Sequence, residues 1–228
     1  MNFDRLRLNE SRGGNLILKA YNIVNVKTTS ECSYKDLRQN SVGFRWNGLN
    51  SQDVRSDDNW TLQLAAEYGH LNVLKWLVKT FYINVEVARS KDNIALRWAA
   101  DNGHLDVLKW LVETFNLNAK DVRSQNNYAL RMTASDGQLD VLKWLVSTFN
   151  LNVDDARSCD NWALRWAAYH GHLDVLKWLV STFNLNSDDV RSDDNYALQM
   201  AAFEGHLDVL KYLCGITGDP VSRWIDSD

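Results

Sequence analysis

Histidine and aspartate recur two positions apart in this chain, a pairing that could act as a general base with its orienting carboxylate. The pairs are His104 with Asp106, His172 with Asp174, and His206 with Asp208. A catalytic site needs such a dyad once, whereas Gln138 occupies the histidine position in another copy and can only hydrogen-bond there. The recurrence therefore predicts a polar structural contact at the start of a helix, not catalysis.

Other chemically reactive residue types form no recognisable site in the sequence. His170 and His172 could pair on a metal ion, but no third ligand recurs beside them. Cys32, Cys159 and Cys214 belong to no CxxC or Cys/His arrangement, and no glycine-rich phosphate loop occurs. The sequence therefore predicts a protein that is not an enzyme and needs no metal or cofactor.

Basic side chains also recur, and they are the type that would bind phosphates. They are Lys75, Lys109, Lys143, Lys177 and Lys211, with Arg55, Arg89, Arg123, Arg157 and Arg191. Acidic residues accompany both series, as Asp106 does Lys109, and the formal net charge is -4. Because phosphate binding needs uncompensated positive charge, we expect no nucleic-acid partner.

Composition excludes further classes of protein. Apolar residues make up 45% of the 228 residues and charged residues 24%, which is globular composition. The start "MNFDRLRLNE" carries charges where a secretory signal has its apolar core, and no apolar run reaches the roughly 18 residues that could cross a bilayer. We expect an intracellular, cytoplasmic protein, with the nucleus as an alternative, and no membrane contact.

The elements that carry these residues repeat along the chain. "GHLDVLKWLV" stands at 103–112 and again at 171–180, and Gly69, Gly103, Gly137, Gly171 and Gly205 are each 34 residues apart. A constant period of this length is the signature of a solenoid. The predicted units are 57–90, 91–124, 125–158, 159–192 and a last one within 193–228.

Each unit predicts two helices and a tight turn. In the fourth unit, Asn161 can cap a helix that starts at Trp162, and Gly171 can end it in the left-handed conformation. Leu173, Leu176, Trp178, Leu179 and Phe183 then form a broad apolar stripe on a second helix. The phase of that stripe places the recurring tryptophans Trp76, Trp110, Trp144 and Trp178 in the core, not on a base-stacking platform.

The unit resembles the ankyrin repeat. "ALRWAADNGHLDVLKWLV", residues 95–112, is similar to the family's "TPLHxAAxxGHLEVVKLLL", and the resemblance extends from residue 57 to about 214. It implies an all-α helix-turn-helix solenoid. The sequence pattern of the 34-residue repeat is similar to that of large ankyrin arrays in unicellular eukaryotes and large DNA viruses.

Two departures from the family pattern change the expected details. The family's helix histidine is replaced by Arg97, Arg131, Arg165, Gln63 or Gln199, which predicts a rebuilt capping network. The hairpin finger is replaced by segments such as "TFNLNAKDVRS", 114–124, in which Asn118 precedes Asp121 by three residues. That spacing suits a capped helical turn, so we expect shortened helical fingers instead of β-hairpins.

The two ends of the chain read as caps. "LRLNESRGGNLILKAYN" from Leu6 aligns with "LRWAADNGHLDVLKWLV" from Leu96, so residues 1–56 are predicted to be a degenerate capping repeat with an insertion at about 22–46. After Cys214, Gly215 and Gly218 break the pattern and Pro220 opposes further helix. A solenoid needs such atypical ends to cover its terminal apolar faces.

Function is expected where otherwise similar repeats disagree. The variable positions at the end of the first helix are Glu67, Tyr68, Asp101, Asn102, Ser135, Asp136, Tyr169, His170, Phe203 and Glu204, with Lys91 and Gln125 in a second column before that helix. The ankyrin resemblance implies that both columns lie on a concave face that binds partners. We therefore expect a monomeric interaction module for a protein partner, the alternatives being a structural or decoy solenoid and an adaptor acting through the 22–46 insertion.

Overall fold

The computed structural model describes residues 59–225, and every regular element in that range is helical. Each described repeat contributes an inner helix and an outer helix, and each of the first four also contributes a short finger helix. The inner helices are α4 (Trp60–Glu67), α7 (Ser90–Asp101), α10 (Ser124–Ser135), α13 (Ser158–Tyr169) and α16 (Ser192–Phe203). The outer helices are α5 (Leu71–Phe81), α8 (Leu105–Phe115), α11 (Leu139–Phe149), α14 (Leu173–Phe183) and α17 (Leu207–Thr217). The finger helices are α6 (Val85–Ala88), α9 (Ala119–Val122), α12 (Val153–Ala156) and α15 (Ser187–Val190), and a 3-10 turn, η3 (Val221–Arg223), follows the last repeat.

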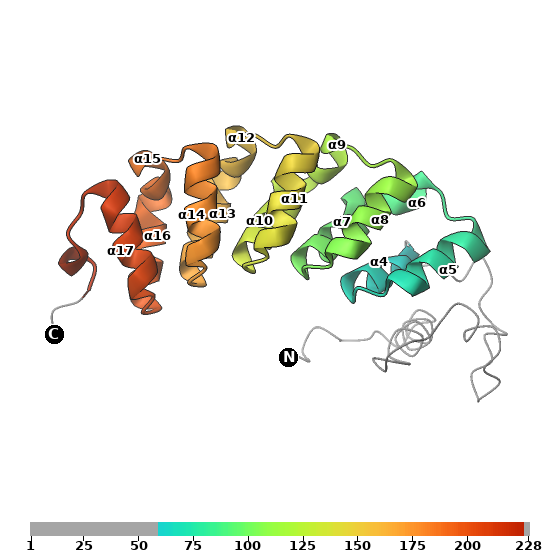
Figure 1. Ribbon diagram of the computed structural model, residues 1–228, viewed down its shortest axis with the longest axis horizontal. Coiled ribbons are helices and arrows are strands. Elements are labelled where there is room, and N and C mark those ends of the chain that lie inside the picture. Colours follow the sequence, from blue (N-terminus) through green and yellow to red (C-terminus); the bar gives the residue numbers. More distant parts are fainter. Residues whose placement is uncertain (1–58, 226–228) are drawn as a thin grey trace, which may run out of the picture.

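The helices stack side by side into a curved array. Figure 1 shows the outer helices in front of the inner ones and the finger helices along the upper, outer rim of the arc. Neighbouring inner helices contact each other far more extensively than neighbouring outer helices do. The inner helices therefore form the more closely packed layer of the stack, and the all-α solenoid predicted from the sequence is confirmed.

Alanine pairs explain the close approach of the inner helices. Ala99 and Ala100 in α7, like Ala167 and Ala168 in α13, have no exposed surface. Small side chains let the helix backbones lie near each other, while Leu108, Leu142 and Leu176 on the outer helices fill the space between layers and are also fully buried. No unit has a core of its own, because each apolar face is covered by the next repeat.

The fingers are single helical turns, as predicted from their asparagine and aspartate spacing. In α9, Asn118 accepts from the Lys120 amide while the Asp121 carboxylate accepts from the Asn118 amide at 2.9 Å. Asn152 with Asp155 and Asn186 with Asp189 form the same reciprocal cap. Within residues 59–225 no β-strand is present, so helical fingers replace hairpins throughout the described repeats.

Arginine side chains join each finger to the following one. Arg123 donates to both carboxylate oxygens of Asp155 at 2.7 and 2.8 Å, and the equivalent pairs are Arg89 with Asp121 and Arg157 with Asp189. The carboxylate that caps one finger thus also binds the guanidinium of the previous finger. In the last repeat Arg191 binds Asp219 instead, which lies beyond α17.

The start of the inner helix differs from the prediction. Cys159, Asp160 and Asn161 all have left-handed backbone angles, with φ between 54° and 56°, so a left-handed turn precedes the right-handed helix. Asn161 does not cap that helix: among the described residues its Oδ1 accepts no hydrogen bond. Its side chain instead hydrogen-bonds toward Asp189 in the finger of the same repeat. Asparagine and aspartate are the non-glycine residues that adopt this conformation at least cost.

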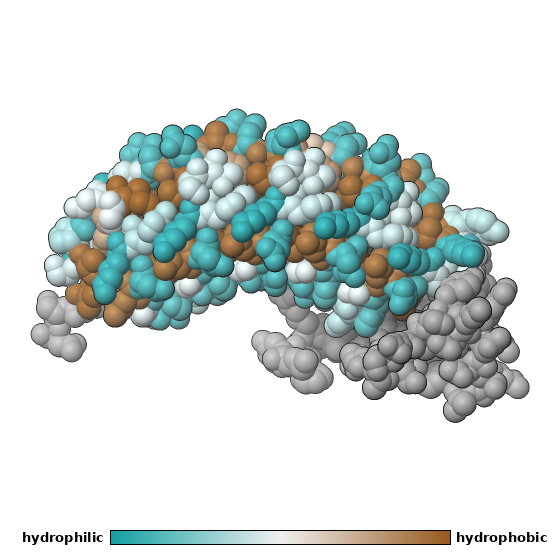
Figure 2. Space-filling model, viewed as in Figure 1, coloured by the Kyte–Doolittle hydropathy of each residue, from teal (hydrophilic) through white to brown (hydrophobic). Residues whose placement is uncertain are grey.

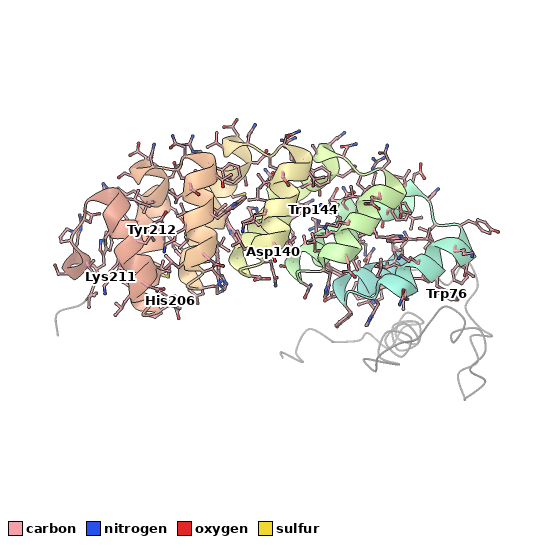
Figure 3. The ribbon with its side chains drawn as sticks, in the orientation of Figure 1. Trp76, Asp140, Trp144, His206, Lys211 and Tyr212 are labelled. Carbon is pink, nitrogen blue, oxygen red and sulfur yellow. The ribbon has the colours of Figure 1, made fainter. Side chains whose placement is uncertain are left out.

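The tryptophan stripe packs against the core, as predicted, but its side chains are not fully buried. Trp76, Trp110, Trp144 and Trp178 are half-buried and pack against the core from the outer helices. Each lies edge-to-face on the phenylalanine five residues later, as Trp144 does on Phe149 with 5.8 Å between ring centroids. Figure 3 shows Trp76 and Trp144 along the outer helices.

The residues predicted to break the repeat pattern at the C-terminal end lie in the last turns of α17 and at its end. Helix α17 continues through Cys214 and Gly215 to Thr217, and Gly218 ends it with a φ of 76°. Pro220 precedes the short turn η3. The predicted N-terminal capping repeat, 1–56, and its insertion at 22–46 lie outside the described residues. No helix in the described part of the chain is long and apolar enough to span a membrane.

Candidate partner-binding surface

The variable positions predicted from the sequence gather on the inner-helix layer, which we define as residues 59–69, 90–103, 124–137, 158–171 and 192–205. In α13, the predicted residue Tyr169 shares one face with Trp162 and Trp166, because the three recur at helical spacing. Glu67, Asp101 and Tyr169 are half-buried, whereas Asn102, Asp136, His170 and Glu204 are exposed. Tyr68 and Phe203 are 48% and 79% exposed.

Ser135 is the exception among the predicted contact residues. Its side chain is only 4% exposed, and its Oγ lies 3.2 Å from Nδ1 of His170 in the next repeat. Ser135 can therefore orient His170 but cannot contact a partner directly. Its place in the variable column is a correction to the prediction, because a small residue there is covered by the longer side chain of the neighbouring unit.

The second variable column lies on the left-handed turns. Lys91 and Gln125 are exposed at the first position of these turns. The Gln125 amide nitrogen donates to Asp92 Oδ2 at 2.6 Å, and Ser124 Oγ donates to the Asp92 carbonyl oxygen, so successive turns are joined. These turns form one edge of the inner-helix layer, and the glycine turns form the other.

Arginines of the inner helices hold the left-handed turns in shape. Arg131 donates from Nε to the Asn126 carbonyl at 2.8 Å and from Nη2 to the Gln125 carbonyl at 3.1 Å. Arg97 and Arg165 make the same two bonds in their repeats, and Gln199 makes one of them in the last repeat. These residues are the rebuilt capping network that replaces the family's histidine. Each bond is charge-assisted where the donor is arginine, which offsets part of the cost of the left-handed backbone.

The same guanidinium groups stack on aromatic rings of the following repeat. Arg97 lies 4.8 Å from the ring centroid of Tyr128, Arg131 lies 5.1 Å from Trp162, and Arg165 lies 5.3 Å from Tyr196. Arg165 also forms an ion pair with Asp193. Cations and aromatic rings therefore alternate along the layer, at separations where the attraction between them is favourable.

The fourth and fifth repeats carry a continuous aromatic cluster, which comprises Trp162, Trp166, Tyr169, His170 and Tyr196. Trp166 is at its centre, with ring centroids 5.0 Å from Trp162, 5.2 Å from Tyr169, 5.7 Å from His170 and 6.4 Å from Tyr196. All five side chains retain some exposure. The Tyr169 hydroxyl hydrogen-bonds to Glu204, whose negative charge is the main cause of a raised pKa for Tyr169.

Sequence reasoning missed part of this surface. Trp98, Met132, Trp166 and Met200 occupy a third variable column on the inner helices, and all four are half-buried. Their variation between repeats was a usable signal, as was the recurrence of Trp60, Tyr128, Trp162 and Tyr196 at the start of the inner helix. In the sequence alone, both columns look like core positions, because they are large apolar residues and the residues between them are buried.

Two of the recurring histidines hydrogen-bond to the backbone of the preceding repeat. His104 Nε2 lies 2.9 Å from the Glu67 carbonyl oxygen at the end of the preceding inner helix, which is the polar contact that the recurrence predicted. His172 makes a backbone hydrogen bond at Ser135 in the same way. Burial lowers the pKa of His172, and the charge of His170 lowers it further. Both effects favour a neutral ring that contributes a hydrogen bond across the interface.

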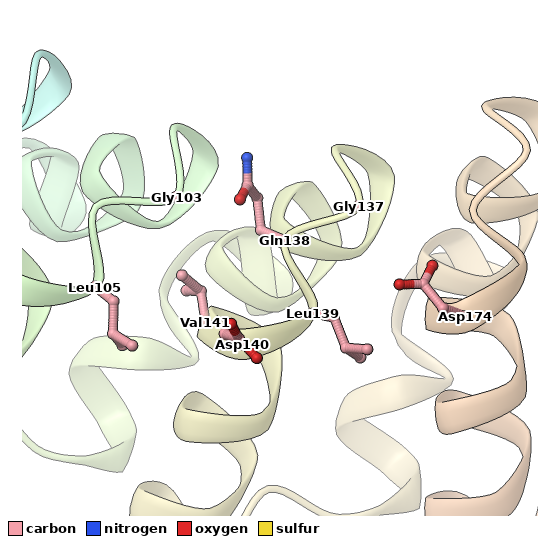
Figure 4. Close-up of a pocket in the computed structure, with 8 residues that line it drawn as sticks. All are labelled: Gly103, Leu105, Gly137, Gln138, Leu139, Asp140, Val141 and Asp174. Carbon is pink, nitrogen blue, oxygen red and sulfur yellow. The ribbon is translucent and has the colours of Figure 1, made fainter.

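The described residues contain no group of three or more potential metal ligands. A shallow, open depression of about 410 Å³ lies between successive glycine turns and is lined by Gly103, Leu105, Gly137, Gln138, Asp140 and Asp174 among others (Figure 4). Its polar side chains come from different repeats and include no nucleophile paired with a base. On the outer face, hydrophilic and hydrophobic side chains alternate in narrow bands that follow the repeats (Figure 2).

Comparison with known proteins agrees with the repeat geometry. A family model described as ankyrin repeats in three copies matches residues 42–126, 96–191 and 130–223, which together cover more than half of the chain. No curated protein sequence matches the chain. Ankyrin repeats are generally protein-protein interaction modules. With five glycine turns at a constant period, stacked helix pairs and this match, the chain belongs to the ankyrin repeat family.

Proposed function

We propose that this protein is a non-enzymatic adaptor that binds a protein partner through its inner-helix layer. One observation carries the proposal: the positions at which nearly identical repeats differ lie together on one face, where large aromatic side chains remain partly exposed. Positions that pack between repeats are constrained to be alike, whereas positions that face a partner are free to differ. Tyr68, Tyr169 and Phe203 are aromatic residues, a type enriched in the buried centres of protein interfaces.

The size of the layer suits a protein partner. Neighbouring helices pack about 8–10 Å apart, so five inner helices present a strip about 40 Å long. Such a strip can contact either a folded domain or an extended segment. The preformed helix stack also means that little backbone ordering is needed on binding, which lowers the entropic cost of association.

Affinity capture from a lysate of the native host tests this proposal. The inner variant carries alanine at Tyr68, Asn102, Asp136, Tyr169, His170 and Phe203. The matched outer variant carries alanine at six exposed positions of the outer helices, namely Asn72, Lys109, Glu113, Lys143, Lys177 and Ser181. Circular dichroism first establishes that both variants fold like the wild type.

We expect proteins that are bound by the wild type and by the outer variant and are lost by the inner variant. Capture lost only by the outer variant would move the site to the opposite face. Capture insensitive to both variants, but lost on deletion of residues 22–46, would favour an adaptor acting through that insertion. Capture of no protein at all would favour a structural solenoid.

A further inference from the structure

The excess negative charge of the described residues is confined to the inner-helix layer. That layer holds eight carboxylates and four basic side chains, whereas the remaining described residues hold twelve of each. The chain's outer helices and fingers are therefore electrically balanced, and the layer proposed as the binding surface is not. The negative charge of this variable surface favours a positively charged partner, because complementary charge steers and orients association.

The carboxylates lie along both edges of the layer. Glu67, Asp101, Asp136 and Glu204 are at the C-terminal ends of inner helices, next to the glycine turns, and Asp92, Asp160, Asp193 and Asp194 are on the left-handed turns. Aromatic side chains of the inner helices lie between the two edges. A segment running along the layer would thus pass between two acidic borders over an aromatic floor.

The layer's own cations are held in internal contacts. The guanidinium groups of Arg97, Arg131 and Arg165 each bond to two backbone carbonyl oxygens of a left-handed turn. Lys91 is the fourth basic residue and lies on the left-handed turn at the start of α7. Since these arginines are fixed by the turns, they add charge but are not positioned to reach outward toward an anionic partner.

The aromatic floor is itself suited to cations. Internal arginines already lie 4.8–5.3 Å from the ring centroids of Tyr128, Trp162 and Tyr196, so the ring faces of this layer accept guanidinium groups. The half-buried Trp166 and Tyr169 extend this floor toward Glu204. A lysine or arginine of a partner would meet an aromatic face and a carboxylate in the same place.

We infer that the inner-helix layer recognises a lysine- and arginine-rich polypeptide segment, whose cations bind the acidic edges and stack on the cluster around Trp166. This inference rests on the proposed function, because it names the chemistry of the partner of the same surface. A strip about 40 Å long accommodates about 12 residues of extended chain. The acidic edges disfavour nucleic acid at this surface, since phosphates would be repelled.

The test measures binding of two fluorescent peptides of about 12 residues by anisotropy, one alternating arginine and serine and the other alternating glutamate and serine. The inner charge variant is Asp136→Lys with Glu204→Lys. Both positions are exposed C-caps of inner helices. A lysine there interacts favourably with the negative end of the helix dipole, so we expect the variant to fold. The matched control, Glu113→Lys with Asp154→Lys, changes the net charge equally at exposed positions outside the layer.

We expect the arginine-serine peptide to bind the wild type, and the inner charge variant to weaken its Kd by about tenfold or more, against about twofold or less for the control. Trp166→Leu should weaken binding, whereas Trp144→Leu on an outer helix should not. Equal weakening by both charge variants, equal binding of the glutamate-serine peptide, or no binding of the arginine-serine peptide would overturn the inference.

The two proposals fail in distinguishable ways. If the basic peptide does not bind but lysate capture still depends on the six inner alanine positions, then the chemistry assigned to the partner is wrong and the interaction surface stands. If capture is indifferent to those six positions, the proposed function fails regardless of the peptide result.

Discussion

At the scale of single residues, each of the first four glycine turns of the described repeats lies against a side chain of the next repeat. Gly171 has a φ of 78°, and a Cβ placed there would lie 2.6 Å from Nδ1 of His206. Gly205 has nearly the same φ, 75°, but no atom lies within 4 Å of its Cβ position, because no histidine of a following repeat lies over it in the described chain. Glycine is therefore required at Gly171 for two separate reasons: it adopts the positive φ without strain, and it leaves space for the imidazole of the next repeat.

Alanine substitution at these two glycines distinguishes the cost of backbone strain from the cost of displacing the imidazole. We expect Gly205→Ala to lower the free energy of unfolding by about 1–2 kcal/mol through backbone strain alone. Gly171→Ala should cost about 1–3 kcal/mol more, because the methyl group displaces His206. Chemical denaturation followed by circular dichroism measures both. The excess should disappear in a His206→Ala background, and equal losses at the two glycines would contradict the interlocking role of the histidine.

At the scale of elements, the finger helices depend on carboxylates that serve two partners. Asp155 is 5% exposed, caps α12 through the Asn152 amide, and accepts two hydrogen bonds from Arg123 of the preceding finger. Burial alone would raise the pKa of Asp155, but the bonds from Arg123 and Asn152 outweigh it and leave the pKa lowered. Asp121 and Asp189 have equivalent partners, and their pKa values are lowered in the same way.

A double-mutant cycle on Arg123 and Asp155 measures this link. Asp155→Ala should lower the free energy of unfolding by about 1–3 kcal/mol, because it removes a finger cap and leaves Arg123 without its acceptor. The coupling between Arg123→Ala and Asp155→Ala should reach about 1 kcal/mol or more. Asp154→Ala, exposed and adjacent, should change stability by less than about 0.5 kcal/mol. Strictly additive losses would show that the bridge between fingers contributes nothing.

Acid should destabilise the stack in two steps, because two kinds of group have lowered pKa values in the folded state. A lowered pKa means that the unfolded chain binds protons first, so the stabilisation is present above the unfolded pKa and is lost as the pH falls below it. For His70 and His172 the loss begins near pH 6.5, and for Asp121, Asp155 and Asp189 it begins near pH 3.8.

Unfolding free energies measured by denaturant titration from pH 8 to pH 3 would resolve these steps. His172→Gln is the matched control, since Gln138 fills the same position in the preceding repeat. The variant should lose part of the upper step and keep the lower one. Stability that rises on going from pH 7 to pH 5.5 would contradict the buried, neutral state of His172.

At the scale of the whole molecule, stability is a property of neighbouring repeats together. Leu176 has no exposed surface and lies in the continuous core that runs through all five helix pairs. In a stack of this kind each unit contacts only its neighbours, so loss of packing in one unit weakens the adjacent units before distant ones. The charge asymmetry belongs to the same scale, since it arises only when five inner helices line one side of the stack.

Leu176→Ala should therefore lower the free energy of unfolding by about 2–5 kcal/mol and increase amide exchange in α11 and α17 as well as in α14. Hydrogen exchange with peptide-level resolution provides the second readout. Leu207→Ala, at a leucine that is 46% exposed, is the control and should cost less than about 1 kcal/mol. A loss under 1 kcal/mol for Leu176→Ala, or exchange confined to α14, would contradict the packing of one repeat on the next.

For residues 59–225, the sequence by itself predicted the order of the helix pairs, the glycine turns and the helical fingers. Each depends on residues a few positions apart, such as Gly171 after α13 or Asn118 and Asp121 around α9. The tertiary structure alone decided what depends on residues 28 to 37 positions apart: the arginine links between fingers, His104 on the Glu67 carbonyl, the stacking of Arg131 on Trp162 and the burial of Ser135. The left-handed turns were not predicted although their contacts are local: Asp160 and Asn161 permit that backbone, and Arg165, five residues after Asp160, donates to its carbonyl oxygen. The backbone conformation of a helix, cap or turn depends mainly on neighbouring residues, so it can be predicted from the sequence. The exposure of side chains and the charge along a face arise only when the repeats stack.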